Sequence, residues 1–269
     1  MNPLDFTAGP SLAFFSGLAL LAWLLAAHFR RQIGGGGRAH PPLTAPELAY
    51  LAGGEQRVAD AVLVELLTSQ AASLSPDGRT IDIDGRMIAD RRDLTDLAGL
   101  GLNGAMRRSA FQNKLWPVVK AIRTRLRGLG LTPHAWELPA YRLKIIAVFA
   151  VPIILGLAKV NVGMEREKPV GFLIILLIIT AFIALRYMGA PRVTRAGREA
   201  LAASKAQNAR AARAPLETEL PLAVALTGLV VLSGTPYDAL HAASQGGDGG
   251  GGGDGGGGCG GGCGGCGGG

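Results

Sequence analysis

Three apolar segments constrain the fold of this 269-residue chain more than any other feature. Residues 11–29, 141–160 and 170–188 are each close to the length that a helix needs to cross the hydrocarbon core of a bilayer. A soluble protein would need a large body to cover helices that are apolar on every side, and this chain has no such mass. The segments therefore predict a mostly α-helical membrane protein with three transmembrane helices.

The first segment has a second possible interpretation, a cleaved signal peptide. A signal peptide carries positive charge ahead of its apolar run, but residues 1–6 contain Asp5 and neither lysine nor arginine. Arg30 and Arg31 come after the run instead. This order predicts an uncleaved membrane anchor.

Lysine and arginine residues predict the orientation of the spans. They follow the first span, precede the second and follow the third, whereas the connector at residues 161–169 balances two basic against two acidic side chains. Basic residues near span ends stay on the cytoplasmic side. We therefore predict that the amino terminus and the connector lie outside, and that residues 30–140 and everything after Met188 lie inside. The formal charge of +7 fits this arrangement without a nucleic-acid partner.

Residues 47–140 predict a small cytoplasmic domain behind a Gly/Pro-rich linker at residues 30–46. Thr44 and Glu47 have the spacing of a helix capping box, and Gly53–Gly54 end that first helix. A second helix with an apolar face follows it. Because these signals imply that the domain has a small core of its own, we expect the domain to fold independently of the bilayer.

A change of period predicts a small hairpin in the middle of this domain. Ile81 and Ile83 alternate with Asp82 and Asp84, and Asp-Gly turns flank the strand. The chain is then expected to return to helix through residues 104–130. Two helices, a hairpin and further helices give an α(+β) domain that resembles a winged helix.

Residues 104–130 combine an apolar stripe at helical spacing with a basic surface and contain no acidic residue. The basic residues are Arg107, Arg108, Lys114, Lys120, Arg123, Arg125 and Arg127. Such a surface attracts lipid headgroups, nucleic acid or an acidic protein. The domain is attached to a membrane at both ends, and electrostatic attraction does not by itself distinguish one DNA sequence from another. We therefore expect anionic inner-leaflet lipids as partners, keep a protein partner as an alternative, and regard nucleic acid as disfavoured.

Two further segments follow the third span. Residues 194–214 are alanine-rich and basic, which predicts a helix that ends before Pro215. The charge-free stretch at residues 222–232 is too short to cross a bilayer. We expect this stretch to pack on the cytoplasmic domain or to lie at the membrane interface.

The final segment, residues 246–269, consists of nineteen glycines, two aspartates and three cysteines. Glycine loses more conformational freedom on folding than any other residue and has no side chain to bury, so this composition predicts a disordered Gly-rich tail. Three interpretations stay open for Cys259, Cys263 and Cys266. They are free thiols on a flexible tether, azole rings made from Gly-Cys pairs, or ligands of a metal ion. The composition favours the tether.

The predicted organisation of the chain has nine parts. They are a short external N-terminus at 1–10, transmembrane helix 1 at 11–29, a Gly/Pro linker at 30–46, the cytoplasmic helical domain with its hairpin at 47–140, transmembrane helix 2 at 141–160, an external connector at 161–169, transmembrane helix 3 at 170–188, a cytoplasmic basic helix and apolar segment at 189–245, and the tail at 246–269.

The sequence carries no motif of a common enzyme class. It has no Gly-x-Ser-x-Gly, no His-Glu-x-x-His and no phosphate-binding loop, and its four histidines are scattered. We therefore predict that the protein is not an enzyme, with no catalytic or cofactor-binding residues and no cofactor. The expected function is a structural or interaction scaffold that presents the tail in the cytoplasm. The alternative is a membrane-bound precursor whose Gly-Cys tail becomes azole-modified or binds metal.

Several segments of the chain occur together in a known family. They are LTAPELAYLAGGEQRVADAVLVELL, VTRAGREAL and ELPLAVALTGLVVLSGT, with the paired apolar spans and the Gly/Cys tail. Together they resemble a family of bacterial membrane proteins identified only by a TIGRFAM domain, and Pro46–Gly54 is the most specific part. The resemblance implies a multi-pass protein of the bacterial inner (cytoplasmic) membrane and implies no site residue.

Reporter fusions to the full-length protein test the predicted orientation. A reporter that works only in the cytoplasm should be active when it is fused after Gln245. A reporter that works only outside should be active when it is inserted within residues 161–169. Both results are expected because the arginines next to the spans keep those ends of the helices on the cytoplasmic side. Activity of the external reporter after Gln245 would contradict the predicted topology.

Overall fold

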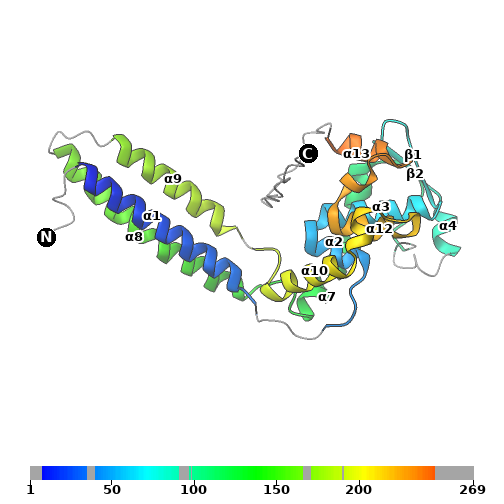
Figure 1. Ribbon diagram of the computed structural model, residues 1–269. Helices are drawn as coiled ribbons and strands as arrows, with labels where there is room; N and C mark the ends of the chain where they lie inside the picture. Colours follow the sequence, from blue (N-terminus) through cyan, green and yellow to red (C-terminus); the bar gives the residue numbers. More distant parts are fainter. Residues whose placement is uncertain are drawn as a thin grey trace, which may run out of the picture.

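The computed structural model describes residues 8–34, 40–90, 97, 99–165, 171–189 and 191–245. It consists of an elongated three-helix bundle joined at one end to a globular domain (Figure 1). The bundle contains α1 (Ala8–Gln32), α8 (Glu137–Glu165) and α9 (Gly171–Met188), and α8 packs against both of the others. All three helices are long and apolar enough to span a membrane, which confirms the three apolar helices that the sequence predicts.

The outer surface of this bundle is apolar. The side chains of Leu20, Ile154 and Phe182 are 55%, 64% and 72% exposed, while a narrow seam that includes Ala26 and Phe149 is buried. Apolar surface of this extent marks a contact with lipid or with another protein. The bundle is therefore suited to a membrane, and the orientation of the helices in it stays a prediction.

The globular domain is built from two stretches of chain that flank α8 and α9. The first stretch forms α2 (Ala45–Gly53), α3 (Glu55–Thr68), β1 (Ala72–Leu74), β2 (Thr80–Ile83), α4 (Gly85–Asp90), β3 (Gly104–Arg107), α6 (Arg108–Lys114) and α7 (Trp116–Gly128). The second stretch forms α10 (Arg195–Gln207), α11 (Ala209–Arg213), η3 (Glu217–Glu219), α12 (Leu220–Thr227), η4 (Leu229–Leu232) and α13 (Asp238–Gln245).

The start of α2 follows the predicted capping pattern. The backbone N–H of Thr44 donates to Glu47 Oε2 at 2.8 Å, which satisfies one of the free donors at the helix start. The other carboxylate oxygen of Glu47 lies 3.1 Å from Arg125 Nε on α7, so one buried acid ties α2 to α7. Gly54 then adopts a positive φ of 76° between α2 and α3, a conformation that favours glycine.

The sheet contains the predicted hairpin and one strand that the sequence does not predict. Strands β1 and β2 pair antiparallel, with Ile81 and Ile83 buried. Residues 104–107, expected to be helical, form β3 instead and pair with β2 so that Met106 lies opposite Ile81. The expectation of helix there is wrong because pairing with a distant strand edge outweighs weak local preference. The likeness of the domain to a winged helix stays a prediction.

Helix α12 lies inside the core of the globular domain. It packs against α2 and α3, and Leu220, Val224 and Leu226 are buried there (Figure 1). The apolar segment at residues 222–232 therefore packs on the globular domain, which is the first of the two positions expected for it. The core consequently includes residues from the carboxy-terminal stretch as well as from residues 47–140.

The sequence alone predicts that residues 41–139 have a complete core, but the core also contains α12. Because α12 is missing from a fragment of residues 41–139, we expect this fragment not to fold cooperatively. Burial of each large side chain of α12 contributes about 1.5–3 kcal/mol, and the net stability of a small domain is only about 5–15 kcal/mol. Thermal unfolding followed by circular dichroism tests this expectation. A sharp, reversible transition for the fragment would contradict it.

The matched control starts at residue 41 like the fragment, so it lacks α1, and it also lacks α8 and α9 but keeps α12. Leu131 O accepts a hydrogen bond from the Thr194 backbone N–H at 3.0 Å, so the chain ends on either side of the excised segment lie close together. A protein that joins residue 133 to residue 191 through a short Gly/Ser linker should therefore unfold cooperatively.

Candidate functional site

The three cysteines singled out by the sequence, Cys259, Cys263 and Cys266, lie outside the described residues, as does the whole of residues 246–269. Within the described ranges, no group of three or more His, Cys, Asp or Glu side chains is placed to hold a metal ion. The candidate site is instead a cavity of the globular domain.

This cavity has a volume of about 390 Å³ and lies between α3, α6, the end of α12 and α13. Its ionisable lining residues are Arg57, Asp60, Arg108 and His241. Uncharged groups from the ends of α2 and α12 complete the wall. Volumes of this size are in the range of small-molecule binding sites.

Asp60 is the buried acid of the cavity. Its Oδ1 lies 2.5 Å from Arg108 Nη2, and the side chains of Asp60 and Arg108 are 7% and 15% exposed. Burial raises the pKa of Asp60, while Arg108 and Arg57 oppose that rise. The carboxylate therefore depends on its two arginine neighbours to stay ionised.

Arg57 reaches into the cavity between two glycines. A Cβ added at Gly53 would lie 2.7 Å from Arg57 Cβ, and one added at Gly228 would lie 2.9 Å from its Cζ. Gly228 also has a positive φ of 97°. Arg57 Nη1 donates to Val224 O at 3.4 Å, and burial lowers the pKa of Arg57. The two glycines thus give the guanidinium its space beside α12.

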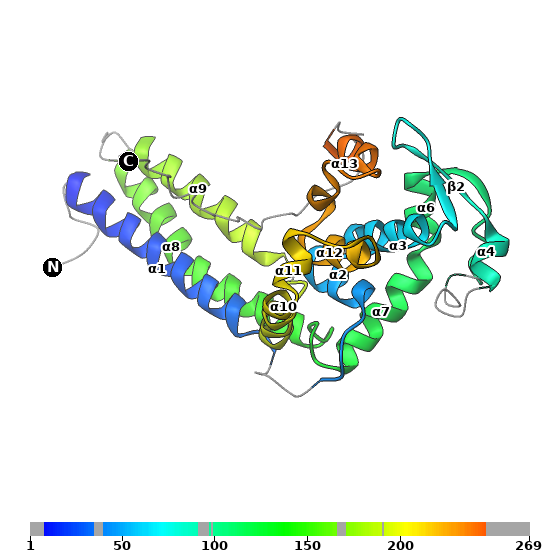
Figure 2. The ribbon, with the colours of Figure 1, turned by 45° about the vertical axis from the view of Figure 1, so that its right-hand side comes forward.

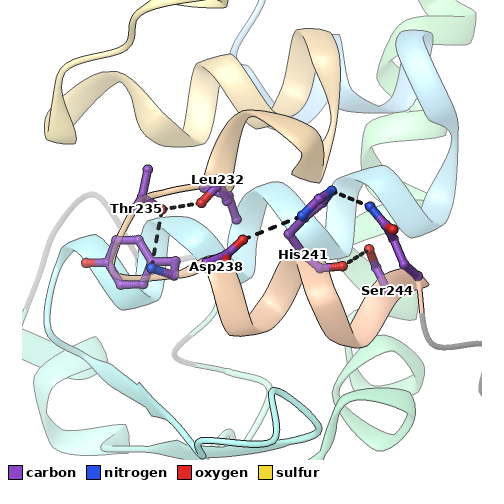
Figure 3. A network of polar contacts seen from close by, with 7 residues as sticks. Leu232, Thr235, Asp238, His241 and Ser244 are labelled. Atoms are coloured by element: carbon purple, nitrogen blue, oxygen red, sulfur yellow. Dashed lines mark hydrogen bonds and ion pairs between the residues drawn. The ribbon is translucent and has the colours of Figure 1, made fainter.

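Helix α13 lines one side of the cavity with His241 and Ser244, and local polar contacts connect residues of this helix and of the turn before it (Figure 3). Thr235 Oγ1 donates to Leu232 O at 2.7 Å in the turn before the helix. His241 Nδ1 lies 3.6 Å from Asp238 Oδ1, and Ser244 Oγ donates to His241 O at 2.6 Å. These contacts fix the face of α13 that carries His241 and Ser244 into the cavity wall.

The hairpin turn and α3 hold α13 in place. A Cβ added at Gly78 would lie 2.2 Å from Ala239 O, so the turn between β1 and β2 packs directly on the helix backbone. The Tyr237 hydroxyl donates to Leu67 O at 3.5 Å, and burial raises the pKa of Tyr237. The last helix is therefore part of the globular domain.

The cavity chemistry favours binding over catalysis. Two guanidinium groups face one carboxylate, which gives a surplus of hydrogen-bond donors suited to an anionic or carboxylate-bearing group. The hydroxyl of Ser244 donates to the backbone carbonyl of His241. Such a set of groups can hold a charged ligand or a partner's side chain.

The basic residues of 104–130 are divided among several roles. Arg108 belongs to the cavity, Arg125 pairs with Glu47, and Lys114 Nζ donates to Gly101 O at 2.9 Å. Lys120 and Arg123 are exposed on α7. The pairing of Asp60 with Arg108 could not be predicted from the sequence. The only local hint of it is that Asp60 is an acidic residue among the apolar residues of α3.

Neither the family models, nor the curated proteins, nor the solved structures compared with this chain give a match.

Replacement of Arg108 tests the energetic role of the ion pair. Arg108→Met should lower the free energy of unfolding by about 3 kcal/mol, because Asp60 would stay buried without its main partner. The double variant Asp60→Asn/Arg108→Met should recover part of that loss, since a neutral amide needs no countercharge. Pulse proteolysis of the full-length protein in detergent across a urea series measures both.

The control is Arg123→Met, which removes the same charge from an exposed position of α7. It should change stability by no more than about 0.5 kcal/mol. An Arg108→Met protein as stable as this control would show that the ion pair does not support the fold.

Proposed function

We propose that this protein is a multi-pass scaffold of the bacterial inner membrane, which holds a globular domain at the cytoplasmic face and presents its Gly/Cys-rich end there. Three helices of spanning length and apolarity support the membrane part of the proposal. Arg30, Arg31, Arg195 and Arg198 gather at the end of the bundle that carries the domain, which supports a cytoplasmic position for it.

The junction between α1 and α10 is the observation that carries this proposal (Figure 2). The backbone N–H of Arg195 donates to Ile33 O at 2.9 Å, and Arg198 Nη2 donates to Arg31 O at 2.5 Å. These bonds join the end of the bundle to the start of the second domain stretch. A domain in a fixed position on its anchor suits a scaffold, whereas a domain on a flexible linker would have no defined position.

The place of α13 supports presentation of the tail beside the cavity. His241 and Ser244 line the cavity, and Gln245 is the last residue of the helix. Helix α13 therefore ends at the cavity edge. A protein or peptide partner that occupied the cavity through an anionic group would lie next to the end of this helix.

Anionic lipids of the inner leaflet are the second proposed partner. Lys120 and Arg123 are exposed on α7, and Trp116 at the start of that helix is 51% exposed. Trp136, which is 74% exposed, stands immediately before α8. Exposed tryptophan and basic side chains together are typical of the membrane–water interface. This composition favours a lipid surface over DNA.

The intact mass of the tail, measured on protein from native membranes, tests the form in which it is presented. We expect an unmodified mass and three iodoacetamide adducts, because an all-glycine surrounding gives the thiols no ordered structure. A loss of about 20 Da per Gly-Cys pair would show azole rings and support the precursor alternative. Retained zinc or iron would instead show a ligand site.

Single replacements make this measurement specific. Cys259→Ser, Cys263→Ser and Cys266→Ser should each remove one adduct and leave the other two. Fewer than three adducts on the unreplaced protein without any mass loss or bound metal would contradict presentation as accessible thiols.

A further inference from the structure

A groove of about 950 Å³ opens where α1 and α9 end and α10 begins. Trp23, Leu24 and Ala27 of α1 line its apolar part, and Trp23 and Leu24 are 41% and 51% exposed. The volume is at the upper end of the range for ligand sites, about 300–1,000 Å³. The groove is therefore large enough for a sizeable ligand with an apolar portion.

The other end of the groove is strongly basic. Its charged lining residues are Arg30, Arg31, Arg195, Arg198 and Glu199. Arg195 Nε lies 2.8 Å from Glu199 Oε1, and Arg30 Cζ lies 5.6 Å from the ring centroid of Tyr187. Four guanidinium groups thus face one carboxylate within the groove, so positive charge remains in excess.

Arg198 stands at the centre of this basic end. Its Nη2 donates to Arg31 O at 2.5 Å and its Nη1 to Val193 O at 3.3 Å, which holds the guanidinium in a defined position. Burial and the positive charges of Arg30 and Arg31 lower the pKa of Arg198. An anion in the groove would relieve that repulsion and accept hydrogen bonds from preorganised donors.

We propose that this groove binds one anionic phospholipid, with the phosphate at the arginines and an acyl chain along Trp23, Leu24 and Ala27. The inference deepens the proposed function and rests on the membrane insertion of α1, α8 and α9. A basic pocket beside the ends of membrane helices is a known form of lipid headgroup site.

The position of the groove favours a lipid over free phosphate. The membrane-type part of α1 extends to Gln32, so the apolar wall at residues 23–27 lies within the apolar stretch and the arginines lie at its end. A phospholipid has the same order, with acyl chains inside the hydrocarbon core and phosphate at its border. Inorganic phosphate would use the arginines and leave the apolar wall empty.

Native mass spectrometry of the full-length protein in a nonionic detergent tests the proposal. The probes are phosphatidylglycerol and phosphatidylcholine with identical acyl chains, added in equal amounts. Both lipids offer the same phosphate, but the quaternary ammonium of phosphatidylcholine would be repelled by the arginines, whereas the glycerol headgroup is neutral. We therefore expect one phosphatidylglycerol per chain to be retained with about tenfold or greater preference. Equal retention of the two lipids would overturn the proposal.

Two variants probe the two ends of the groove separately. Arg30→Gln should weaken phosphatidylglycerol binding about tenfold through the lost charge. Ala27→Trp keeps every arginine and fills the apolar part, so it should also reduce retention. The control is Arg86→Gln, which makes the same charge change at an exposed position of α4 and should bind like the unreplaced protein. An equal loss in the control would mean general charge attraction and would overturn the site.

A competition and an extraction complete the test. Excess inorganic phosphate should leave the bound lipid in place, and full displacement by phosphate would identify a free-anion site instead. Alkaline extraction of native membranes should leave the protein in the membrane pellet. Protein that is released would refute membrane insertion and the lipid site together, whereas an integral protein without lipid preference would refute only the site.

Discussion

Thr194 stands at the point where the helix bundle and the globular domain meet, and both parts depend on its hydrogen bonds. Its backbone N–H donates to Leu131 O, and its hydroxyl donates to Gly130 O and accepts from the N–H of Gly197. A Cβ at Gly34 would lie 2.5 Å from Thr194 Cβ, so the chain just after α1 also passes directly against it. Two segments that are distant in the sequence therefore meet at one buried side chain. That side chain stands at the start of α10, which lines the arginine groove.

Local signals explain why the sequence predicts much of this architecture. The apolar spans, the Glu47 cap, the glycine break at Gly54 and the alternation at Ile81 and Ile83 each depend on neighbours within a few residues. Such features need no knowledge of the fold, and the structure contains each of them.

Features that depend on distant segments could not be predicted in the same way. Met106 becomes part of a strand only because the edge of β2 is available, and α12 enters the core only because α2 and α3 leave a place for it. The pairing of Asp60 with Arg108 joins residues 48 positions apart. For the same reason the candidate cavity and the arginine groove have no sequence signature, although their individual arginines are visible. The opposite holds for the three cysteines, because they are conspicuous in the sequence but lie outside the described residues.

The place of α12 in the core sets an order of events during synthesis. Ribosomes add about 5–20 residues per second, so α2 and α3 emerge several seconds or more before the helix that covers their apolar faces. In that interval α8 and α9 are made while the domain is still incomplete. The unfinished core then exposes apolar surface that a chaperone can cover. The domain can therefore be completed only after both α8 and α9 have been synthesised.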